Sequence, residues 1–368
     1  MPFKRNFPFI PQANGLYIIR GPRQIGKTSW LKTILAKQCK KRSCYYQSCE
    51  RISDYKELGV LLDSLANREI ILLDEISFVD QWERAIKYFI DSGKSKIIIL
   101  TGSHAFDLKR GSDRMPGRFA AGGEFELLPM DFPEFEKVRK QAKWHTGNEL
   151  SELEAFFRVG GFPLSVAKGG RKAVTSLSVI ETYWKWLAGD IVTLGKREEY
   201  LKEILVEIAR VITTPVSLNN FSNNTSFGSH NTVSEYLEVL EACYAVRTLF
   251  AIDIDTGIIK RKKNRKIYFT DPIIYWLALQ KSEIDFTTVD YSRVAEMVAH
   301  EFLTRRHHNL GYFSNKNGEV DFVKPKSWAI EVKWSPVATN ISKTYHNLKI
   351  PFKQVWTQNN FLNETNYT

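Results

Sequence analysis

Residues 21–28 constrain the fold of this chain more than any other segment. They read Gly-Pro-Arg-Gln-Ile-Gly-Lys-Thr and fit the pattern G-x-x-x-x-G-K-[ST] at every fixed position. A short apolar run at residues 15–20 precedes them, and a helical pattern at residues 27–40 follows. A glycine loop between a buried strand and a helix turns its backbone N–H groups toward phosphates. The sequence therefore predicts a phosphate-binding loop.

The side chains of this loop suit a nucleoside triphosphate with magnesium. Gly21 and Gly26 allow backbone angles that other residues resist. Lys27 brings a positive charge to the β- and γ-phosphates, and the hydroxyl of Thr28 is a ligand for Mg²⁺. The start of the following helix adds a favourable field for anions. We therefore predict that ATP with Mg²⁺ is bound by Gly21, Pro22, Arg23, Gln24, Ile25, Gly26, Lys27, Thr28 and Ser29.

Two further apolar runs end in polar residues. Residues 69–73 lead into Asp74 and Glu75. On a strand beside the loop, Asp74 can orient the magnesium shell and Glu75 can polarise the attacking water. Residues 96–100 lead into Thr101 and Ser103, and a hydroxyl at this place can sense the γ-phosphate. Both hydroxyls are candidates, and Ser103 is the preferred one. The alternative is an ordinary strand end or turn in each case.

The apolar runs lack alternation and are separated by helical stretches, which is typical of a parallel sheet covered on both faces. Residues 81–92 supply one of these helices, with its apolar side chains on a single face. We expect a P-loop α/β domain over residues 1–140. Arg118 lies late in this domain and is a candidate for stabilising transition-state charge, in its own subunit or on a neighbouring subunit. The alternative is a surface arginine of no special role.

The sequence pattern changes after this domain. Residues 141–197 are mostly helical, and we interpret them as a lid or linker region. Residues 198–280 contain amphipathic helices followed by strand-like runs at 248–253 and 266–269. Helices followed by a basic-tipped hairpin outline a winged helix. We assign residues 281–368 to a further, small α/β domain.

The hairpin predicted in residues 198–280 is strongly basic between its strands. As a wing, it would contact phosphates of DNA, with an affinity that falls as salt rises. The net charge of +11 agrees with a polyanionic partner. The alternative is a solvated hairpin tip, and no base-reading residue can be named. The basic wing, residues 260–266, contains Lys260, Arg261, Lys262, Lys263, Arg265 and Lys266.

Carboxylates and a lysine gather in the C-terminal segment. Asp321 lies in one strand-like run, and Glu331 and Lys333 lie two apart in the next, so that they share a face. Two carboxylates can hold a second Mg²⁺, and a lysine beside them can activate water for phosphodiester cleavage. Glu296, on a helix predicted at 293–306, fits as a further carboxylate better than Glu301 does.

The set of Glu296, Asp321, Glu331 and Lys333 resembles the PD-(D/E)xK nuclease fold of restriction endonucleases and Holliday-junction resolvases. Three interpretations stay open at this point. The segment is a working metal-dependent nuclease, a nuclease-like domain used for binding or assembly, or a charged hairpin that arose by chance.

Cysteines stand at positions 39, 44, 49 and 243. They lack the second pair of ligands that zinc sites need, so we expect reduced structural thiols in a cytosolic protein. No apolar run approaches the roughly 18 residues that span a bilayer. Residues 1–8 lack the apolar core of a signal peptide. We therefore expect a cytoplasmic protein that does not contact a membrane.

Several motifs together resemble the prokaryotic AAA-type ATPases of the AAA_14 and archaeal ATPase, MNS-STAND-like group, whose members carry a C-terminal DUF4143- or DUF234-like domain. The resemblance implies an ASCE/AAA-type parallel sheet, ATP hydrolysis and a C-terminal PD-(D/E)xK fold, and it places Arg118 on the arginine of the family. The matching segments are the loop at 21–28, Ile-Leu-Leu-Asp-Glu-Ile at 71–76, Leu-Thr-Gly-Ser at 100–103, Leu-Leu-Pro-Met-Asp-Phe-Pro-Glu-Phe at 127–135, Gly-Gly-Phe-Pro at 160–163 and Tyr-Phe-Thr-Asp-Pro at 268–272.

These observations favour an ATPase that couples its nucleotide state to a DNA-binding winged helix and a nuclease-like domain. One alternative is a STAND-like signalling switch with protein partners and an inactive nuclease fold. A second alternative is a metal-dependent DNA nuclease that ATP gates.

Overall fold

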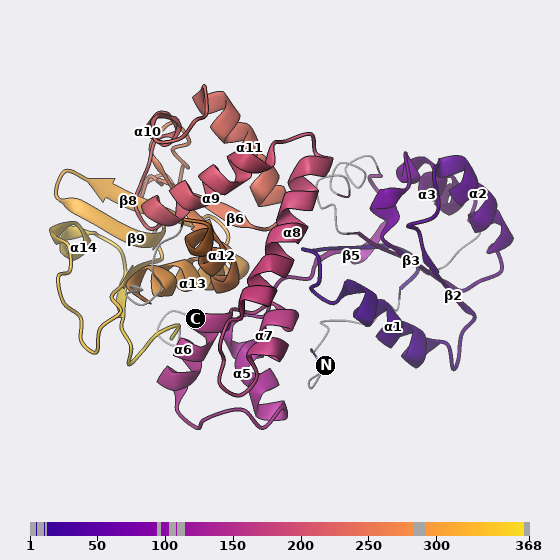
Figure 1. Cartoon of the computed structure of the whole chain (residues 1–368), viewed down its shortest axis with the longest axis horizontal. Coiled ribbons are helices and arrows are strands. Elements are labelled where there is room, and N and C mark those ends of the chain that lie inside the picture. Colours follow the sequence, from indigo (N-terminus) through magenta and orange to yellow (C-terminus); the bar gives the residue numbers. More distant parts are fainter. Residues whose placement is uncertain are drawn as a thin grey trace. The chain divides into compact units, whose positions relative to one another are not determined.

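The computed structural model describes Arg5, Pro11 and residues 13–93, 97–102, 108, 115–282 and 291–363. The chain divides into two compact units, which Figure 1 shows with their helices and strands. One unit spans Lys4–Pro129, and the other contains Met130–Thr368. Everything from Met130 onward lies in one compact unit. The four-domain division expected from the sequence stays a prediction.

A parallel sheet forms the centre of the first unit. Its strand order is β2-β3-β4-β1-β5, and every neighbouring pair is parallel. Because β1, β4 and β3 are neighbours and run parallel, the carboxyl ends of these three strands meet at one edge of the sheet. The strands are β1 (Gly15–Arg20), β2 (Cys44–Ser48), β3 (Ile70–Asp74), β4 (Ile97–Thr101) and β5 (Phe119–Glu126).

Helices cover both faces of this sheet, as the apolar runs predicted. α1 (Lys27–Gln38) lies on one face, and α2 (Tyr55–Ser64) and α3 (Trp82–Asp91) lie on the other (Figure 1). A short 3-10 helix, η1 (Ile76–Phe78), follows β3. On the α2 and α3 side, alternate strand residues form one core with the helices: Leu16, Ile18, Ile71, Leu73, Ile98 and Leu100. The predicted α/β fold with a parallel sheet is confirmed.

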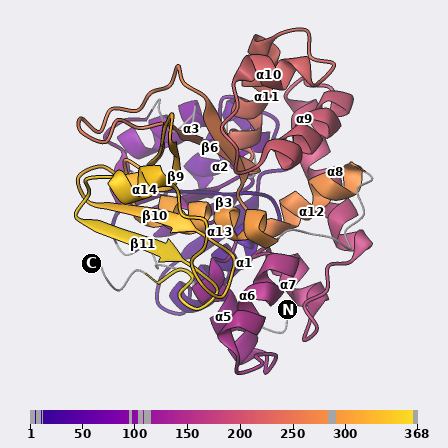
Figure 2. The same cartoon turned by 90° about the vertical axis from the view of Figure 1, so that its left-hand side faces the viewer.

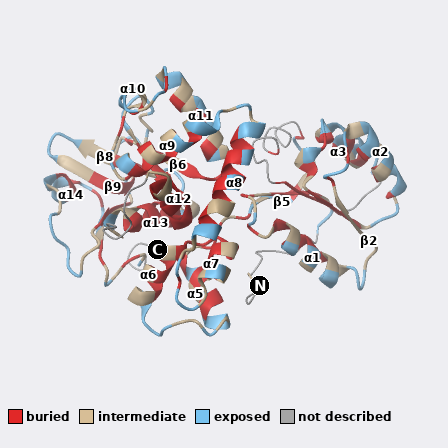
Figure 3. Ribbon diagram, viewed as in Figure 1, coloured by how far each residue is buried: buried red, intermediate tan, exposed pale blue. Residues whose placement is uncertain are grey.

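Helices make up most of the second unit. They are α5 (Phe132–Gln141), α6 (Glu149–Val159), α7 (Pro163–Gly169), α8 (Leu177–Thr193), α9 (Glu198–Val211), α10 (Leu218–Asn223), α11 (His230–Ala242), α12 (Pro272–Lys281), α13 (Tyr291–Arg306) and α14 (Lys343–Asn347). α12 is buried along most of its length (Figure 3), and all of its residues from Pro272 to Leu279 are buried. It is therefore the central helix of this unit.

A hairpin follows three of these helices. β6 (Val246–Phe250) and β7 (Arg265–Phe269) pair antiparallel directly after α9, α10 and α11. Val216, between α9 and α10, adds an isolated antiparallel bridge to Arg265. Ser229 caps α11 by accepting from the backbone N–H of Thr232, which explains why this helix begins at His230.

A second, smaller sheet has the order β11-β10-β9-β8. Its strands are β8 (Gly311–Asn315), β9 (Gly318–Lys324), β10 (Trp328–Val332) and β11 (Phe352–Trp356). β10 pairs parallel with β11, and the other neighbours are antiparallel. Figure 2 shows β9, β10 and β11 with α14 and α13 beside them. A mixed sheet with helices fits the small α/β region that the sequence predicted.

The segment that follows β6 contacts this smaller sheet. Ala251 forms a parallel bridge with Tyr312 of β8, and the backbone N–H of Ile252 donates to the carbonyl oxygen of Tyr312 at 2.9 Å. The side chain of Ile252 is buried in one apolar cluster with Val320 and Tyr345. The hairpin and the sheet therefore share a core.

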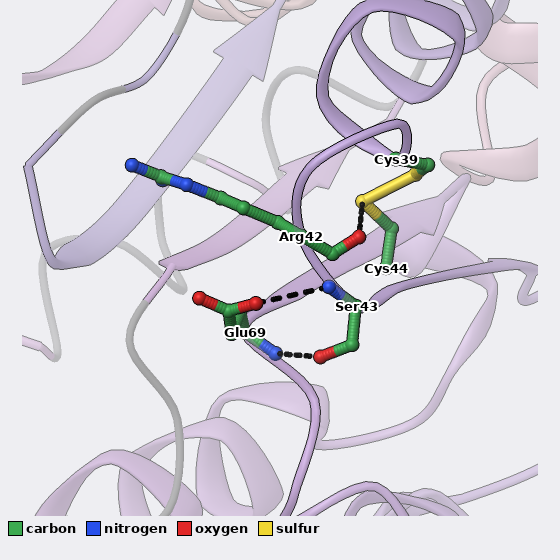
Figure 4. Close-up of a disulfide and its surroundings, with 5 residues drawn as sticks. All are labelled: Cys39, Arg42, Ser43, Cys44 and Glu69. Atoms are coloured by element: carbon green, nitrogen blue, oxygen red, sulfur yellow. Dashed lines mark hydrogen bonds between the residues drawn. A yellow bond between two sulfur atoms is a disulfide. The ribbon is translucent and has the colours of Figure 1, made fainter.

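Cys39 and Cys44 are joined by a disulfide at the end of α1, with their Cα atoms 5.5 Å apart (Figure 4). The expectation of reduced thiols is wrong for this pair. The chain reverses between the C-cap of α1 at Cys39 and the first residue of β2 at Cys44, and this reversal brings the two cysteines together. The remaining cysteines, Cys49 and Cys243, are buried and lie outside this bridge.

Candidate active site

The glycine loop joins β1 to α1 in a conformation that its glycines allow. Gly21 has a φ of 154°, and a Cβ there would lie 2.1 Å from the carbonyl oxygen of Leu127. Gly26 has a φ of 104°, which other residues rarely adopt. Lys27 is 4% exposed, and its Nζ donates to the carbonyl oxygens of Gly21 and Pro22, at 2.9 Å each. The loop therefore curls around the ammonium group of Lys27.

The remaining residues of the loop lie around the start of α1. The helix begins at Lys27 with Gly26 as its N-cap, and its first turn contains no acidic residue. Such a helix start offers backbone N–H groups to an anion. Arg23 and Thr28 are half-buried, Gln24 and Ser29 are exposed, and Ile25 is buried. The arrangement fits a phosphate chain bound at the loop, with the hydroxyl of Thr28 at the helix start.

Asp74 ends β3 at the edge where β1 ends, and two hydroxyls hold its carboxylate. Thr101, at the end of β4, donates its hydroxyl to one carboxylate oxygen, and Tyr46 of β2 donates to the other at 3.0 Å. Asp74 is 3% exposed and Thr101 is fully buried. Burial and the negative charge of Asp74 raise the pKa of Tyr46 to about 12, so its hydroxyl keeps the proton that it donates.

Glu75 follows Asp74 in a left-handed backbone conformation, with φ 54° and ψ 44°. Its backbone N–H donates to the hydroxyl oxygen of Thr101 at 3.3 Å. Residues other than glycine adopt this region at a cost, and such residues cluster at functional sites. The turn ends β3 abruptly and sets Glu75 at the carboxyl edge of the sheet, half-buried beside Asp74.

Thr101 thus contacts both acidic residues through one hydroxyl. The sequence left Thr101 and Ser103 open and preferred Ser103, which lies outside the described residues. Tyr46 and Arg5 are two residues that sequence reasoning missed. Arg5 donates to the carbonyl oxygens of Ile25 and Leu128, at 3.2 and 2.9 Å, and so holds the loop by its backbone. Neither lies in a recognisable motif, and no local pattern signals its role.

The structure does not bring Arg118 to this edge of the sheet. Arg118 directly precedes β5, whose first residue pairs with Leu16 near the start of β1. Its guanidinium forms two hydrogen bonds with the carboxylate of Asp91 at the end of α3, at 2.8 and 2.9 Å. Because the strands are parallel, Arg118 lies at the amino edge, opposite the glycine loop. A role on the nucleotide of its own subunit has no support in this geometry.

The C-terminal carboxylates gather around a lysine from β7. The Nζ of Lys266 lies 2.9 Å from Glu296, 2.5 Å from Glu319 and 3.2 Å from Asp321, measured to carboxylate oxygens. The side chain of Lys266 is fully buried. Tyr268 donates its hydroxyl to the same oxygen of Glu296 at 2.6 Å. These carboxylates together with Glu331 are called the carboxylate cluster below.

Asp321 and Glu331 lie side by side within this cluster. Asp321 accepts from the backbone N–H of Val332 at 3.0 Å, and Lys266 and this hydrogen bond hold its pKa below the ordinary value despite burial. Burial and the charge of Asp321 raise the pKa of Glu331 to about 9. Lys333 stands at the edge, with its Nζ 3.7 Å from Glu331. Burial and the adjacent charge of Asp321 therefore favour the protonated form of Glu331.

Lys266 corrects two sequence-based expectations. It was assigned to the basic wing that contacts DNA, yet it points inward, because alternate residues of β7 face opposite sides and Arg265 takes the outer one. Its ammonium also occupies the centre of the set expected to bind a second Mg²⁺. Within the residues that the structure describes, no group of three or more His, Cys, Asp or Glu side chains is arranged to hold a metal ion.

The rest of the predicted wing is divided in its contacts. Arg261, Lys262 and Lys263 are exposed in the turn between Ile259 and β7, and the guanidinium of Arg261 lies 4.9 Å from the ring centre of Phe250. Lys260 instead pairs with Asp253 at 2.7 Å, and the guanidinium of Arg265 lies 5.2 Å from the ring centre of Phe250.

In the part of the chain described here, no helix is long and apolar enough to cross a bilayer.

Two family models match parts of the chain. Residues 13–136 match the AAA domain model AAA_14, and residues 150–284 match a domain of unknown function, DUF8612. Neither match is the expected DUF4143- or DUF234-like domain, and DUF8612 is not shown to be a nuclease.

Related proteins and solved structures are distant. The chain is 27% identical over 341 residues to an uncharacterized protein of Methanocaldococcus jannaschii, a match that covers 84% of this chain and 72% of that protein. It is 26% identical over 313 residues to an uncharacterized protein of Haemophilus influenzae, covering 82% and 74%. A Walker-type ATPase of Pyrococcus abyssi is similar with a TM-score of 0.47 and 18% identity, covering 72% of this chain and 90% of that one. Residues 13–136 are therefore similar to the AAA domain model, and the strand order and the loop geometry agree with a parallel-sheet P-loop α/β fold.

Proposed function

We propose that this chain binds ATP with magnesium on its glycine loop and hydrolyses it. The observation that carries the proposal is the convergence of four residues at one edge of a parallel sheet: Lys27, Asp74, Glu75 and Thr101. Lys27 lies at the end of the loop that follows β1. Asp74 is the last residue of β3 and Glu75 comes directly after it. Thr101 is the last residue of β4, which lies between β1 and β3 in the sheet.

Each residue has a distinct role in this proposal. Lys27 exchanges its two carbonyl partners for phosphate oxygens, and the N–H groups at the start of α1 bind the phosphate chain. Thr28 and Asp74 are the residues that hold magnesium, which when bound neutralises charge on the phosphates. Thr101 and Tyr46 fix the orientation of the Asp74 carboxylate, so that it needs no rearrangement when the metal arrives. Glu75 accepts a proton from the attacking water.

Substitutions at Lys27 and Glu75 separate binding from hydrolysis. Lys27→Ala is expected to abolish ATP binding, because the loop then loses its only buried cation among the described loop residues. Glu75→Gln is expected to keep binding and to lower turnover by ~100-fold or more, the usual effect of a lost general base. Binding is measured by calorimetry with MgATP and turnover by phosphate release. Turnover by Glu75→Gln at the unmodified rate would refute the assigned role.

We also propose that residues 198–280 form a winged helix that binds DNA through Arg261, Lys262 and Lys263. Three helices, a bridge at Val216 and the β6–β7 hairpin support this arrangement, since a winged helix has these parts in this order. The exposed cations in the turn before β7 support the choice of partner.

Salt dependence tests the DNA contact. Replacing Arg261, Lys262 and Lys263 by Gln is expected to weaken duplex binding and to reduce the slope of log affinity against log salt by about 0.9 for each lost phosphate contact. A matched control replaces three exposed lysines in and after α5, Lys137, Lys140 and Lys143, and is expected to leave the slope unchanged. Equal slopes for both triple variants, or no binding at low salt, would refute the DNA contact.

One observation favours the alternative of a switch with a protein partner. Glu238 is exposed on α11, the helix that a winged helix normally lays against DNA, and its charge repels phosphates. The ammonium of Lys266 within the carboxylate cluster likewise favours a nuclease-like fold used for binding over one that cleaves. ATP turnover measured with and without duplex DNA separates the two candidates, because the switch is expected to show no stimulation by DNA.

Arg118 enters the proposed function only through a neighbouring subunit. Its ion pair with Asp91 is partly exposed, and such a pair opens at little cost. We propose that Arg118 acts in a homo-oligomer, where it completes the nucleotide site of an adjacent copy. Turnover per subunit then rises with protein concentration, and Arg118→Ala abolishes that rise. A rate per subunit that is independent of concentration would count against the role.

A further inference from the structure

The disulfide between Cys39 and Cys44 joins the P-loop helix to the sheet. Cys39 is the C-cap of α1, and Cys44 is the first residue of β2 (Figure 4). Their Cα separation of 5.5 Å lies within the usual disulfide range of ~4.4–6.8 Å. The separation of the two Cα atoms is therefore compatible with a disulfide.

The surroundings of this pair are those of reactive cysteines. Cys39 is exposed, and the closed loop carries the cations Lys40, Lys41 and Arg42. Reactive thiols lie in electropositive, partly exposed places, because nearby positive charge favours the thiolate. Cys49 is the opposite case: burial and the charges of the neighbouring acidic residues raise its pKa to about 12, so it stays protonated. The chain thus contains one accessible pair and an inert thiol close to its nucleotide site.

Contacts around the bond suit the reduced form as well. The sulfur of Cys44 lies 3.6 Å from the carbonyl oxygen of Arg42, a contact that becomes an S–H···O hydrogen bond when Cys44 is a thiol. Ser43 and Glu69 form a clasp between β2 and β3: the N–H of Ser43 donates to the Glu69 carboxylate at 3.0 Å, and the N–H of Glu69 donates to the Ser43 hydroxyl at 3.1 Å. This clasp holds the Cys44 side in place without the disulfide, so the sulfurs stay near each other after reduction.

We propose that Cys39 and Cys44 are a reversible redox site that fastens and releases the end of α1. The oxidant is a small-molecule disulfide such as oxidised glutathione. The Cys39 thiolate attacks one of its sulfurs and releases one glutathione thiolate. The Cys44 thiolate then attacks the Cys39 sulfur and releases the second, so that two thiols are oxidised, one disulfide is reduced and two protons pass to the products and solvent. Reduced glutathione drives the reverse reaction.

The site has a consequence for the nucleotide, which rests on the proposed ATPase function. α1 begins with Lys27 and Thr28, and β2 carries Tyr46, which donates to Asp74. The disulfide ties together the two elements that supply these residues. The oxidised chain therefore holds its phosphate-binding helix and the support of Asp74 in one fixed arrangement, and the reduced chain loosens it.

Thiol counting on the full chain tests the redox site without any reference to ATP. The protein is equilibrated with glutathione mixtures of graded reduced-to-oxidised ratio, quenched with a maleimide and weighed by mass spectrometry. The expected result is the paired loss of two thiols, reversed by raising the reduced form, while Cys39→Ser and Cys44→Ser each hold one bound glutathione instead. A pair that never forms, or one that stays oxidised in pure reduced glutathione, overturns the proposal.

Hydrogen exchange of the same samples tests the fastening. Amides of the last turn of α1 and of β2 are expected to exchange about tenfold faster in the reduced chain, and those of the smaller sheet at an unchanged rate. Identical exchange in both redox states overturns the mechanical part of the proposal. ATP turnover is then compared between the two states and in the double variant Cys39→Ser/Cys44→Ser, where no thiol of the pair remains and turnover is expected to be insensitive to glutathione. If no preparation hydrolyses ATP, the proposed function fails while thiol counting and exchange still decide the redox site.

Discussion

The ammonium nitrogen of Lys266 lies 2.9 Å from a carboxylate oxygen of Glu296, although 30 residues of chain separate them. Through this contact and those to Glu319 and Asp321, a cation from the chain itself balances the carboxylate cluster. Nuclease folds place a metal ion among such carboxylates, whereas here the positive charge is covalently attached to β7. The cluster therefore joins β7 to α13 and β9 as a structural ion network.

Removing the charge of Lys266 is expected to destabilise the second unit strongly. Lys266→Met leaves several buried carboxylates without their cation, and breaking a buried pair in this way costs about 3–5 kcal/mol. Chemical denaturation monitored by tryptophan fluorescence measures the loss. Lys262→Met, which removes an exposed lysine of the same hairpin, is the matched control and is expected to change stability by less than about 0.5 kcal/mol. Comparable losses in both variants would refute the network.

The carboxylate cluster also predicts how stability depends on pH. Burial raises the pKa of Glu296 to about 7 and that of Glu331 to about 9, whereas an unfolded glutamate titrates near its ordinary value of 4.5. Between about pH 5 and 9 the folded chain therefore holds protons that the unfolded chain has released. Stability is expected to fall as pH rises through this window, by about 1.4 kcal/mol per pH unit for each proton. Lys266 stays charged throughout, because its pKa is raised above the ordinary 10.5.

Glu331→Gln tests this dependence. The amide does not titrate, so the variant is expected to keep only the Glu296 part of the slope between about pH 5 and 7 and to lose the slope between about pH 7 and 9. Glu238→Gln, an exposed substitution on α11, is expected to keep the full slope. Denaturation midpoints measured at several pH values give the comparison, and parallel curves for both variants would contradict the assignment.

The hydroxyl of Tyr46 predicts a further effect on the candidate nucleotide site. Tyr46→Phe removes the donor to one oxygen of Asp74 and leaves Thr101 on the other, so the carboxylate is less firmly oriented. ATP turnover is expected to fall about tenfold with little change in chain stability, as is usual when a partner of a metal ligand is lost. Tyr45→Phe is the control on the same strand, because the Tyr45 hydroxyl donates to Gln47. Equal turnover in the two variants would dismiss the role of Tyr46.

Gly161 is expected to tolerate no side chain. A Cβ there would lie 1.9 Å from the carbonyl oxygen of Met130, and its N–H donates to the carboxylate of Asp271 at 2.7 Å. Gly161→Ala should therefore cost several kcal/mol, through overpacking and the loss of a buried hydrogen bond. Gly189→Ala, in α8 with open space around it, is expected to stabilise the chain by up to about 1 kcal/mol. Thermal unfolding of both variants measures the contrast.

The sequence predicted those elements whose signal is local. β3 and β4 are uninterrupted apolar runs, and the glycine loop has a fixed spacing. β5 escaped prediction because Gly122 and Gly123 interrupt it and its pairing with β1 shifts register between Leu16 and Ile18. β2 escaped because it is an edge strand of half-buried residues with no apolar run.

The contacts of the candidate sites depend on distant residues, which local patterns do not reveal. Lys266 reads as one more cation in a basic run, and only its partners in α13 and β9 distinguish it from Lys262. Tyr46 likewise stands in an ordinary strand 28 residues before the aspartate that it holds. The motifs at 160–163 and 268–272 are connected in the structure, because Asp271 accepts a hydrogen bond from the N–H of Gly161. The sequence alone does not show this contact.

The shared core of the β6–β7 hairpin and the smaller sheet bears on how this chain can be cut. A fragment that stopped at residue 284, where the DUF8612 match ends, would keep Ile252 and Lys266 but lose the strands that cover them. The apolar side chain of Ile252 and the ammonium of Lys266 would then be exposed to water. The family boundary is therefore not a folding boundary, and the region matched by DUF8612 depends for its stability on the eighty or so residues that follow it.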